Sequence, residues 1–166
     1  MSRTDRNPDA SSPSTELDLT RFLPYRLNNL GGRISQALAV IYRRRFGISI
    51  PEWRILVWLN ERPVLTAKQL TELTQMDKVR VSRSVRALES RNLIHRQPST
   101  EDQRQQWLRL TDDARALLAE LIPATRRWEA ELAATLSEGE HEALLAALNK
   151  LEERLDHLVA AESGKD

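Results

Sequence analysis

A run of cations in the middle of the chain is the feature of this sequence with the clearest chemical use. Lys78, Arg80, Arg83 and Arg86 follow one another within nine residues, and no Asp or Glu lies between them. An exposed helix usually mixes charges of both signs, so a face with cations alone favours a polyanionic partner such as nucleic acid.

A helix over residues 78–91 would place these cations on one side. Val81, Val85 and Leu88 lie at i, i+4 and i+7, which predicts a buried stripe. Asp77 is a good N-cap, and Asn92 accepts the left-handed conformation that ends many helices. The side chains on the opposite arc, with two cations beside them at the N-terminal end, are Val79, Ser82, Arg83, Arg86, Lys78 and Arg80.

Short elements on either side would hold this helix in place. Thr66 and Gln69 form a capping-box pattern that opens a short helix ending near Gln75, followed at once by a tight turn. Residues 93–96 and 106–110 predict a β-hairpin, joined by a polar loop over residues 97–105. Upstream, Ser49 and Glu52 form another capping box, which opens a helix to about residue 60.

Long helices are expected at both ends of the chain. Leucine and isoleucine recur at steps of three and four from Leu23 to Ile41, interrupted by Gly31 and Gly32, where we expect a kink or a close backbone approach. Residues 144–158 carry a leucine seam at alternating steps of four and three. Such a seam needs a partner helix, from the same chain or from a second copy, and we favour dimerisation through the two chain ends.

Charge and composition support this division and exclude other classes of protein. Residues 1–65 and 66–110 each carry a net charge of +4, whereas residues 111–166 carry −7. The chain has no cysteine and no apolar stretch long enough to span a membrane, which suits a cytoplasmic protein. Its three histidines fall on separate expected elements, and no catalytic, metal-ligand or phosphate-loop motif is present, so we expect neither an enzyme nor a metal or cofactor.

Several strings resemble the MarR family of winged helix-turn-helix transcriptional regulators over roughly residues 20–160. Residues 77–89, DKVRVSRSVRALE, are similar to that family's recognition helix, and residues 93–96, LIHR, to the start of its wing. The triplet Asp102-Gln103-Arg104, followed by residues 108–111, LRLT, is similar to its wing signature. Asn92 stands where the family usually has glycine.

The resemblance implies a homodimer that places two recognition helices in successive major grooves of double-stranded DNA, on a pseudo-palindromic operator. It implies that Arg104 at the wing tip enters the minor groove and that Asp102 holds it or a neighbour; otherwise the two form an ordinary exposed ion pair. The DNA-contacting set that we predict is Thr66, Lys68, Gln69, Lys78, Val79, Arg80, Ser82, Arg83, Arg86, Asp102 and Arg104.

Many members of the family respond to small aromatic acids bound between the first long helix and the DNA-binding lobe. The resemblance suggests Tyr25, Asn29, Arg33 and Trp53 as the lining of such a cleft, with the arginine pairing a carboxylate. Tyr25 and Trp53 are equally suited to a core or an interface.

The sequence therefore predicts a mainly α-helical protein with a small β wing. We expect a disordered tail over residues 1–16, an N-terminal dimerisation helix over 17–48, the winged helix-turn-helix domain over 49–110, C-terminal dimerisation helices over 111–160 and a tail over 161–166. The expected function is a DNA-binding regulator, most simply a repressor released by an aromatic acid. The alternative is a protein-interaction module that acts through the leucine seam of residues 144–158 without specific DNA binding.

Overall fold

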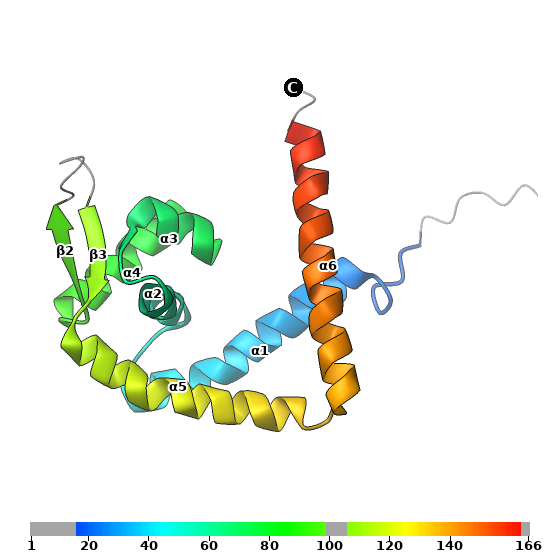
Figure 1. Ribbon diagram of the computed structural model, residues 1–166, viewed down its shortest axis with the longest axis horizontal. Helices are drawn as coiled ribbons and strands as arrows, with labels where there is room; N and C mark the ends of the chain where they lie inside the picture. The colour runs from blue at the N-terminus through cyan, green and yellow to red at the C-terminus, as the bar shows by residue number, and fades with distance from the viewer. Residues whose placement is uncertain (1–15, 99–105, 164–166) are drawn as a thin grey trace, which may run out of the picture.

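The computed structural model describes residues 16–98 and 106–163, and these are mostly helical, with one small sheet (Figure 1). The expected tail over residues 1–16 falls almost entirely outside the described residues. The elements in chain order are α1 (Leu23–Phe46), α2 (Ile50–Glu61), β1 (Leu65–Thr66), α3 (Ala67–Thr74), α4 (Lys78–Ser90), β2 (Ile94–Pro98), β3 (Gln106–Leu110), α5 (Asp112–Ala133) and α6 (Glu138–Ser163).

Side-chain caps fix where several of these helices begin. Ser49 and Glu52 bond reciprocally at the start of α2, as Thr66 and Gln69 do at the start of α3. The Asp77 carboxylate accepts a hydrogen bond from the Arg80 backbone N–H at 2.8 Å and caps α4. Each cap satisfies a backbone donor that has no partner within its helix, so the starts predicted from the sequence are confirmed.

The first helix starts later than the expected domain boundary at residue 17. Residues 18–21 form a turn instead, in which the backbone N–H and the hydroxyl of Thr20 both donate to Asp18 Oδ1, at 2.9 and 2.6 Å. Pro24 follows in the first turn of α1. Proline lacks an N–H and is best tolerated in the first turn of a helix, where that N–H would have no partner, so its position agrees with a helix that begins just before it.

The sheet has the order β1-β3-β2 and is antiparallel throughout. β2 and β3 form the expected hairpin, with Ile94 opposite Leu110 and Pro98 opposite Gln106. Strand β1 was not predicted: it is two residues long, and Leu65 pairs with Leu108. Such a short strand has no periodicity of its own and exists only because β3 offers it a partner.

One core joins α2, α3, α4, the sheet and the halves of α1 and α5 nearest to them. Val81, Val85 and Leu88 of α4 are at most 1% exposed, which confirms the buried stripe predicted for this helix. Tyr42 of α1 stacks on Trp53 of α2, with ring centroids 5.6 Å apart. This packing fixes α4 against the body of the protein through one face and leaves its opposite face in solvent.

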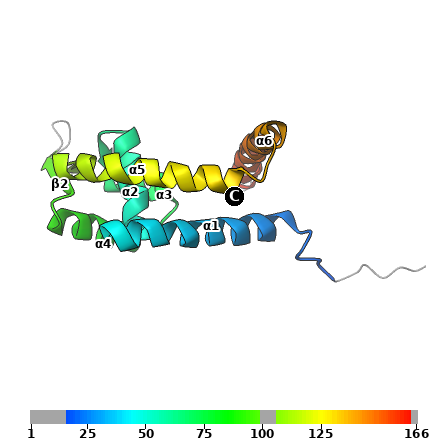
Figure 2. The ribbon, with the colours of Figure 1, turned by 90° about the horizontal axis from the view of Figure 1, so that it is seen from below.

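The long helices α1 and α5 run side by side, away from this core, and α6 rises from the far end of α5 (Figures 1 and 2). No residue of α6 is buried within the described chain, and all of its leucines except the partly buried Leu148 are exposed. The helix continues to Ser163, past the boundary that we had placed at residue 160. Gly31 and Gly32 lie inside a continuous α1, and a Cβ at either would meet nothing within 4 Å, so the close approach that we expected is not made within the chain.

Candidate nucleic-acid interface

The two helices α3 and α4 form a helix-turn-helix whose tight turn depends on Gln75. This residue has φ = 54°, a left-handed conformation that lets α3 end and α4 begin three residues later. Leu70 of α3 is fully buried and packs in the same core as the apolar stripe of α4. The solvent-facing side of α4 is therefore held at a fixed orientation to α3.

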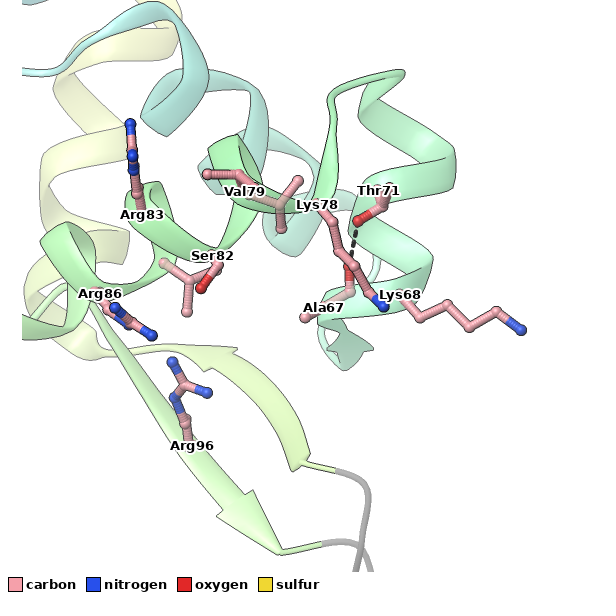
Figure 3. Close-up of a pocket in the computed structure, with 11 residues that line it drawn as sticks. Ala67, Lys68, Thr71, Lys78, Val79, Ser82, Arg83, Arg86 and Arg96 are labelled. Atoms are coloured by element: carbon pink, nitrogen blue, oxygen red, sulfur yellow. Dashed lines mark hydrogen bonds between the residues drawn. The ribbon is translucent and has the colours of Figure 1, made fainter.

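A hollow of about 500 Å³ lies on this face, between the N-terminal part of α3, the exposed side of α4 and the first residues of the wing strand β2 (Figure 3). We call it the cationic groove. Its described lining contains five cations and no acid. These cations are Lys68, Lys78, Arg83, Arg86 and Arg96, and the remaining lining residues are Ala67, Thr71, Val79, Val81, Ser82 and Val85. Converging positive charge in contact with water attracts a polyanion and releases its counterions.

Six residues of the predicted DNA-contacting set line the cationic groove: Lys68, Lys78, Val79, Ser82, Arg83 and Arg86. Val79 is 58% exposed, so its methyl groups are accessible to a binding partner. In Figure 3, Arg86 of α4 and Arg96 of β2 reach toward each other across one end of the groove. The lysines lie at its other end.

The other predicted contacts lie elsewhere. Thr66 and Gln69 bond each other in their capping box, at the start of α3. Arg80 points to the opposite side of α4 and lines a second hollow beneath α1 instead of the cationic groove. Asp102 and Arg104, the predicted wing-tip pair, lie outside the described residues.

Arg96 is the cation of the groove that the sequence analysis did not include among the DNA contacts. Its guanidinium grips the Glu89 carboxylate of α4 with two bonds, Nε to Oε1 at 2.6 Å and Nη2 to Oε2 at 2.8 Å. The bond to Glu89 raises the pKa of Arg96 above its usual value. No local pattern identifies this pair, because the two residues are seven positions apart and the helix end that reverses the chain lies between them.

The four residues predicted for an effector cleft do not come together within the chain. Tyr25, Asn29 and Arg33 line an open hollow of about 580 Å³ on the exposed face of α1. Trp53 instead packs against the core and stacks on Tyr42, which follows Tyr25 by 17 residues, or roughly 25 Å along a helix. Trp53 thus packs at the edge of the core, where stacking on Tyr42 holds its ring.

A second hollow of about 410 Å³ does lie between α1 and the DNA-binding lobe, and we call it the interhelix hollow. It carries two cations, Arg54 of α2 and Arg80 of α4, beside the polar side chains of Asn28, Ser35 and Gln36. Gly31 and Gly32 also line it. The sequence analysis missed Arg54 because it precedes by 26 residues the arginine that shares the hollow with it.

Within residues 16–98 and 106–163, no group of three or more His, Cys, Asp or Glu is arranged to hold a metal ion. No helix in the same part of the chain is long and apolar enough to cross a membrane.

The buried stripe and cationic face of α4, the turn from α3 and the adjoining β2–β3 wing define a winged helix-turn-helix DNA-binding protein. Comparison with known proteins agrees with that class. The model of the MarR family matches residues 46–105, and over that segment the chain is similar to this family of transcriptional regulators.

Relatives match over much more of the chain than the family model does. The HTH-type transcriptional regulator MgrA of Staphylococcus aureus is 28% identical over 83% of this chain and 92% of its own. A crystal structure of a MarR/EmrR family transcriptional regulator from Acinetobacter sp. ADP1 has a TM-score of 0.77 at 26% identity, covering 85% of this chain and 99% of that one. A MarR family transcriptional regulator from Silicibacter pomeroyi has a TM-score of 0.72 at 28% identity, covering 86% and 93%.

Proposed function

We propose that this chain acts in the cytoplasm as a homodimeric repressor that binds a pseudo-palindromic operator and leaves it when a small aromatic acid binds. The observation that carries the proposal is the cationic groove, whose described lining has five cations and no acid, three of the cations on the exposed side of α4 and the others on α3 and β2. In a MarR-family regulator, this is the helix that would enter the major groove.

The types of side chain suggest how the work of binding is divided. Arg83 and Arg86 suit guanine edges or phosphates, and the Val79 methyl groups suit a thymine methyl. Lys68 and Lys78, at the other end of the groove, suit the phosphate backbone. The Asp102 and Arg104 contacts of the wing tip stay part of the proposal. Arg96 would add a cation at the base of the wing.

The dimer is supported by apolar surface that the single chain leaves uncovered. Leu151, Leu155 and Leu158 of α6 are 41%, 59% and 47% exposed. Leu27 and Leu30 near the start of α1 are exposed as well. Monomeric soluble proteins rarely expose long apolar stripes, and a second copy of the same helices would cover them.

For the effector, we propose the interhelix hollow as the binding site. Arg54 and Arg80 offer two guanidinium groups for a carboxylate, and a volume of about 410 Å³ suits a small ring. Because Arg80 belongs to α4, a ligand bound there would contact the recognition helix from behind. Tyr25, Asn29 and Arg33 line the neighbouring hollow on α1 and are the alternative site for the same ligand.

The test is a fluorescence-anisotropy titration of the purified protein with its own upstream intergenic DNA and with a scrambled duplex. The titration is run at two salt concentrations, with and without each of a panel of aromatic acids. Arg83→Ala should weaken specific binding by about 1–3 kcal/mol, whereas Arg127→Ala, which removes an exposed cation from α5, should not. Specific binding that an aromatic acid weakens supports both parts of the proposal.

Other outcomes test the operator and the effector parts of the proposal separately. If the protein binds the specific duplex and no acid alters its affinity, the operator part of the proposal stands and the effector part is wrong. Equal affinity for specific and scrambled DNA would contradict the repressor and favour the interaction module acting through α6. Arg54→Ala should abolish the response to the acid while leaving operator affinity in its absence close to that of the unmodified protein, because Arg54 does not line the cationic groove.

A further inference from the structure

The C-terminal end of α4 is a junction at which three helices meet. The chain leaves α4 through Asn92, whose φ of 56° is left-handed. The N–H of Asn92 donates to Glu89 O and that of Leu93 to Leu88 O, both at 2.9 Å. This pair of bonds is a Schellman motif with Asn at the position that usually holds glycine. Glycine would suffice for the backbone, so the asparagine side chain calls for a separate explanation.

Arg91, the residue before it, binds the end of α1. Its Nη1 donates to Gly47 O and its Nη2 to Phe46 O, both at 2.9 Å, across 44 and 45 residues of sequence. The last carbonyls of a helix lack partners of their own and form the negative end of its dipole. A guanidinium is the side chain best suited to grip two of them at once, because its donors form a rigid fork.

Asn92 binds the start of α5 from the other side. Its Nδ2 donates to Asp113 Oδ2 at 2.9 Å, and its carbonyl accepts from Thr111 Oγ1 at 2.7 Å. The Thr111 N–H also donates to Leu93 O at 3.1 Å. Thr111 is the N-cap of α5 and Asp113 lies in its first turn, so these bonds reach the helix at its origin. Arg91 and Asn92 thus fasten one end of α4 to both long helices, and we call this the α4 joint.

Because the α4 joint lies at one end of α4, a small change in angle there displaces the side chains at the other end that would contact DNA. Apolar packing holds the middle of α4 but is not directional, whereas hydrogen bonds at one end constrain how the helix is aimed. α4 has 13 residues and is therefore about 20 Å long, so a tilt of about 10° about the joint moves the Lys78 end by about 3 Å. One base pair rises by about the same distance, 3.4 Å.

We propose that Arg91 and Asn92 are positioning residues that, by fixing α4 to α1 and α5, set the half-site spacing that the dimer accepts. The proposal rests on the proposed function, because it requires a dimer on a two-part operator. α1 carries part of the apolar surface expected to pair the protomers, and α5 leads into α6, which carries the rest. When α4 is fixed to α1 and α5, its distance from the α4 helix of the partner subunit has one value. When these bonds are absent, that distance varies.

The probe is an operator selected by the unmodified protein from a randomised duplex library, then remade with its central spacer one base pair shorter, one longer and two longer. The measured quantity is the ratio of dissociation constants between the altered and the selected spacing. We expect Asn92→Gly and Arg91→Ala each to reduce this ratio by about fivefold, within the usual range of coupling between sites. Asn92→Gly is the sharper variant, since glycine keeps the left-handed backbone and removes the bond to Asp113 alone.

Matched variants separate positioning from general damage. Asp113→Ala should reduce the ratio as Asn92→Gly does, and the double variant should do no more than either, because both remove the same bond. Asp112→Ala removes an acid from the same first turn of α5 and should leave the ratio unchanged. Arg44→Ala removes an exposed cation from the last turn of α1 and is the charge control for Arg91→Ala.

The outcomes are distinguishable from failure of the proposed function. An unmodified protein that selects no operator overturns the proposed function and this inference with it. If an operator is selected, but the Arg91 and Asn92 variants weaken binding equally at every spacing, the joint is merely structural and the inference is wrong. Retained dimerisation and helical circular dichroism in Asn92→Gly, together with a flattened spacing ratio, establish it.

Discussion

Arg96 of the wing strand and Glu89 of the recognition helix α4 are joined by two bonds of 2.6 and 2.8 Å, so the wing is fastened to the helix beside which it would contact DNA. Both side chains are about one-third exposed, at 37% and 30%. Solvent screening at that exposure limits the contribution of the pair to stability to under about 1 kcal/mol. Its importance is therefore geometric and electrostatic: Glu89 neutralises one of the five cations of the groove.

Replacing Glu89 by glutamine frees that cation. We expect Glu89→Gln to strengthen binding to scrambled DNA and to increase the salt slope of binding by about one, because one more cation then neutralises phosphate. Preference for the specific duplex should fall as the wing loses its fixed angle. Anisotropy titrations at several salt concentrations measure the affinity for scrambled DNA, the salt slope and the preference for the specific duplex. Glu72→Gln on α3 is the control for the removal of one acid. An unaltered salt slope would contradict the prediction.

The exposed leucine seam of α6 predicts the effect of a charge placed in it. Leu155→Glu puts a carboxylate where a dimer would bury a leucine, and an unpaired buried charge is strongly unfavourable. We expect a monomer at micromolar concentration by sedimentation, with loss of specific DNA binding. Ala146→Glu, on the opposite side of α6, should remain a dimer. A dimeric Leu155→Glu protein would place the interface elsewhere.

Gly32 is expected to lower the stability of α1 and to leave open space in the interhelix hollow that it lines. A Cβ at Gly32 meets nothing within 4 Å, so Gly32→Ala should raise the free energy of unfolding by about 0.5–1 kcal/mol through helix propensity alone. The same methyl group protrudes into the interhelix hollow and should weaken the response to an aromatic acid. Gly139→Ala in α6, also open, is the control that should leave that response intact. A loss of stability in thermal melts would show that a partner copy packs against the glycine.

Glu140 gives the start of α6 a defined pH dependence. Hydrogen bonds from the Ser137 backbone N–H and hydroxyl, both 2.8 Å, lower the pKa of Glu140 from its ordinary value of 4.5. The carboxylate therefore stabilises the helix start fully above about pH 4.5, and this contribution is lost as the pH falls through the lowered folded-state pKa. Carboxyl-carbon NMR titration of Ser137→Ala should show the pKa of Glu140 returning toward 4.5. An identical midpoint in both proteins would refute the role of the cap.

Much of this architecture is local and could be predicted from residue order. Capping boxes at Ser49 and Thr66, the Asp77 cap and the spacing of Val81, Val85 and Leu88 determine helix starts and buried faces through contacts within four residues. The same periodicity identifies the exposed arc of α4, which is why most of its predicted DNA-contacting side chains line the cationic groove.

Contacts between residues far apart in the sequence leave no local pattern, so the tertiary structure alone determines them. Arg80 and Arg83 are three residues apart on one helix, yet Arg80 lines a hollow beneath α1 because that long helix passes close to the start of α4. Trp53 belongs to the core because α1 brings Tyr42 to its ring, which no spacing within α2 could indicate. Arg91 and Arg96 are also cations of ordinary appearance in the sequence. The tertiary fold brings the end of α4, with Arg91, to the carbonyls that end α1, and chain reversal at Asn92 brings Arg96 to the Glu89 carboxylate.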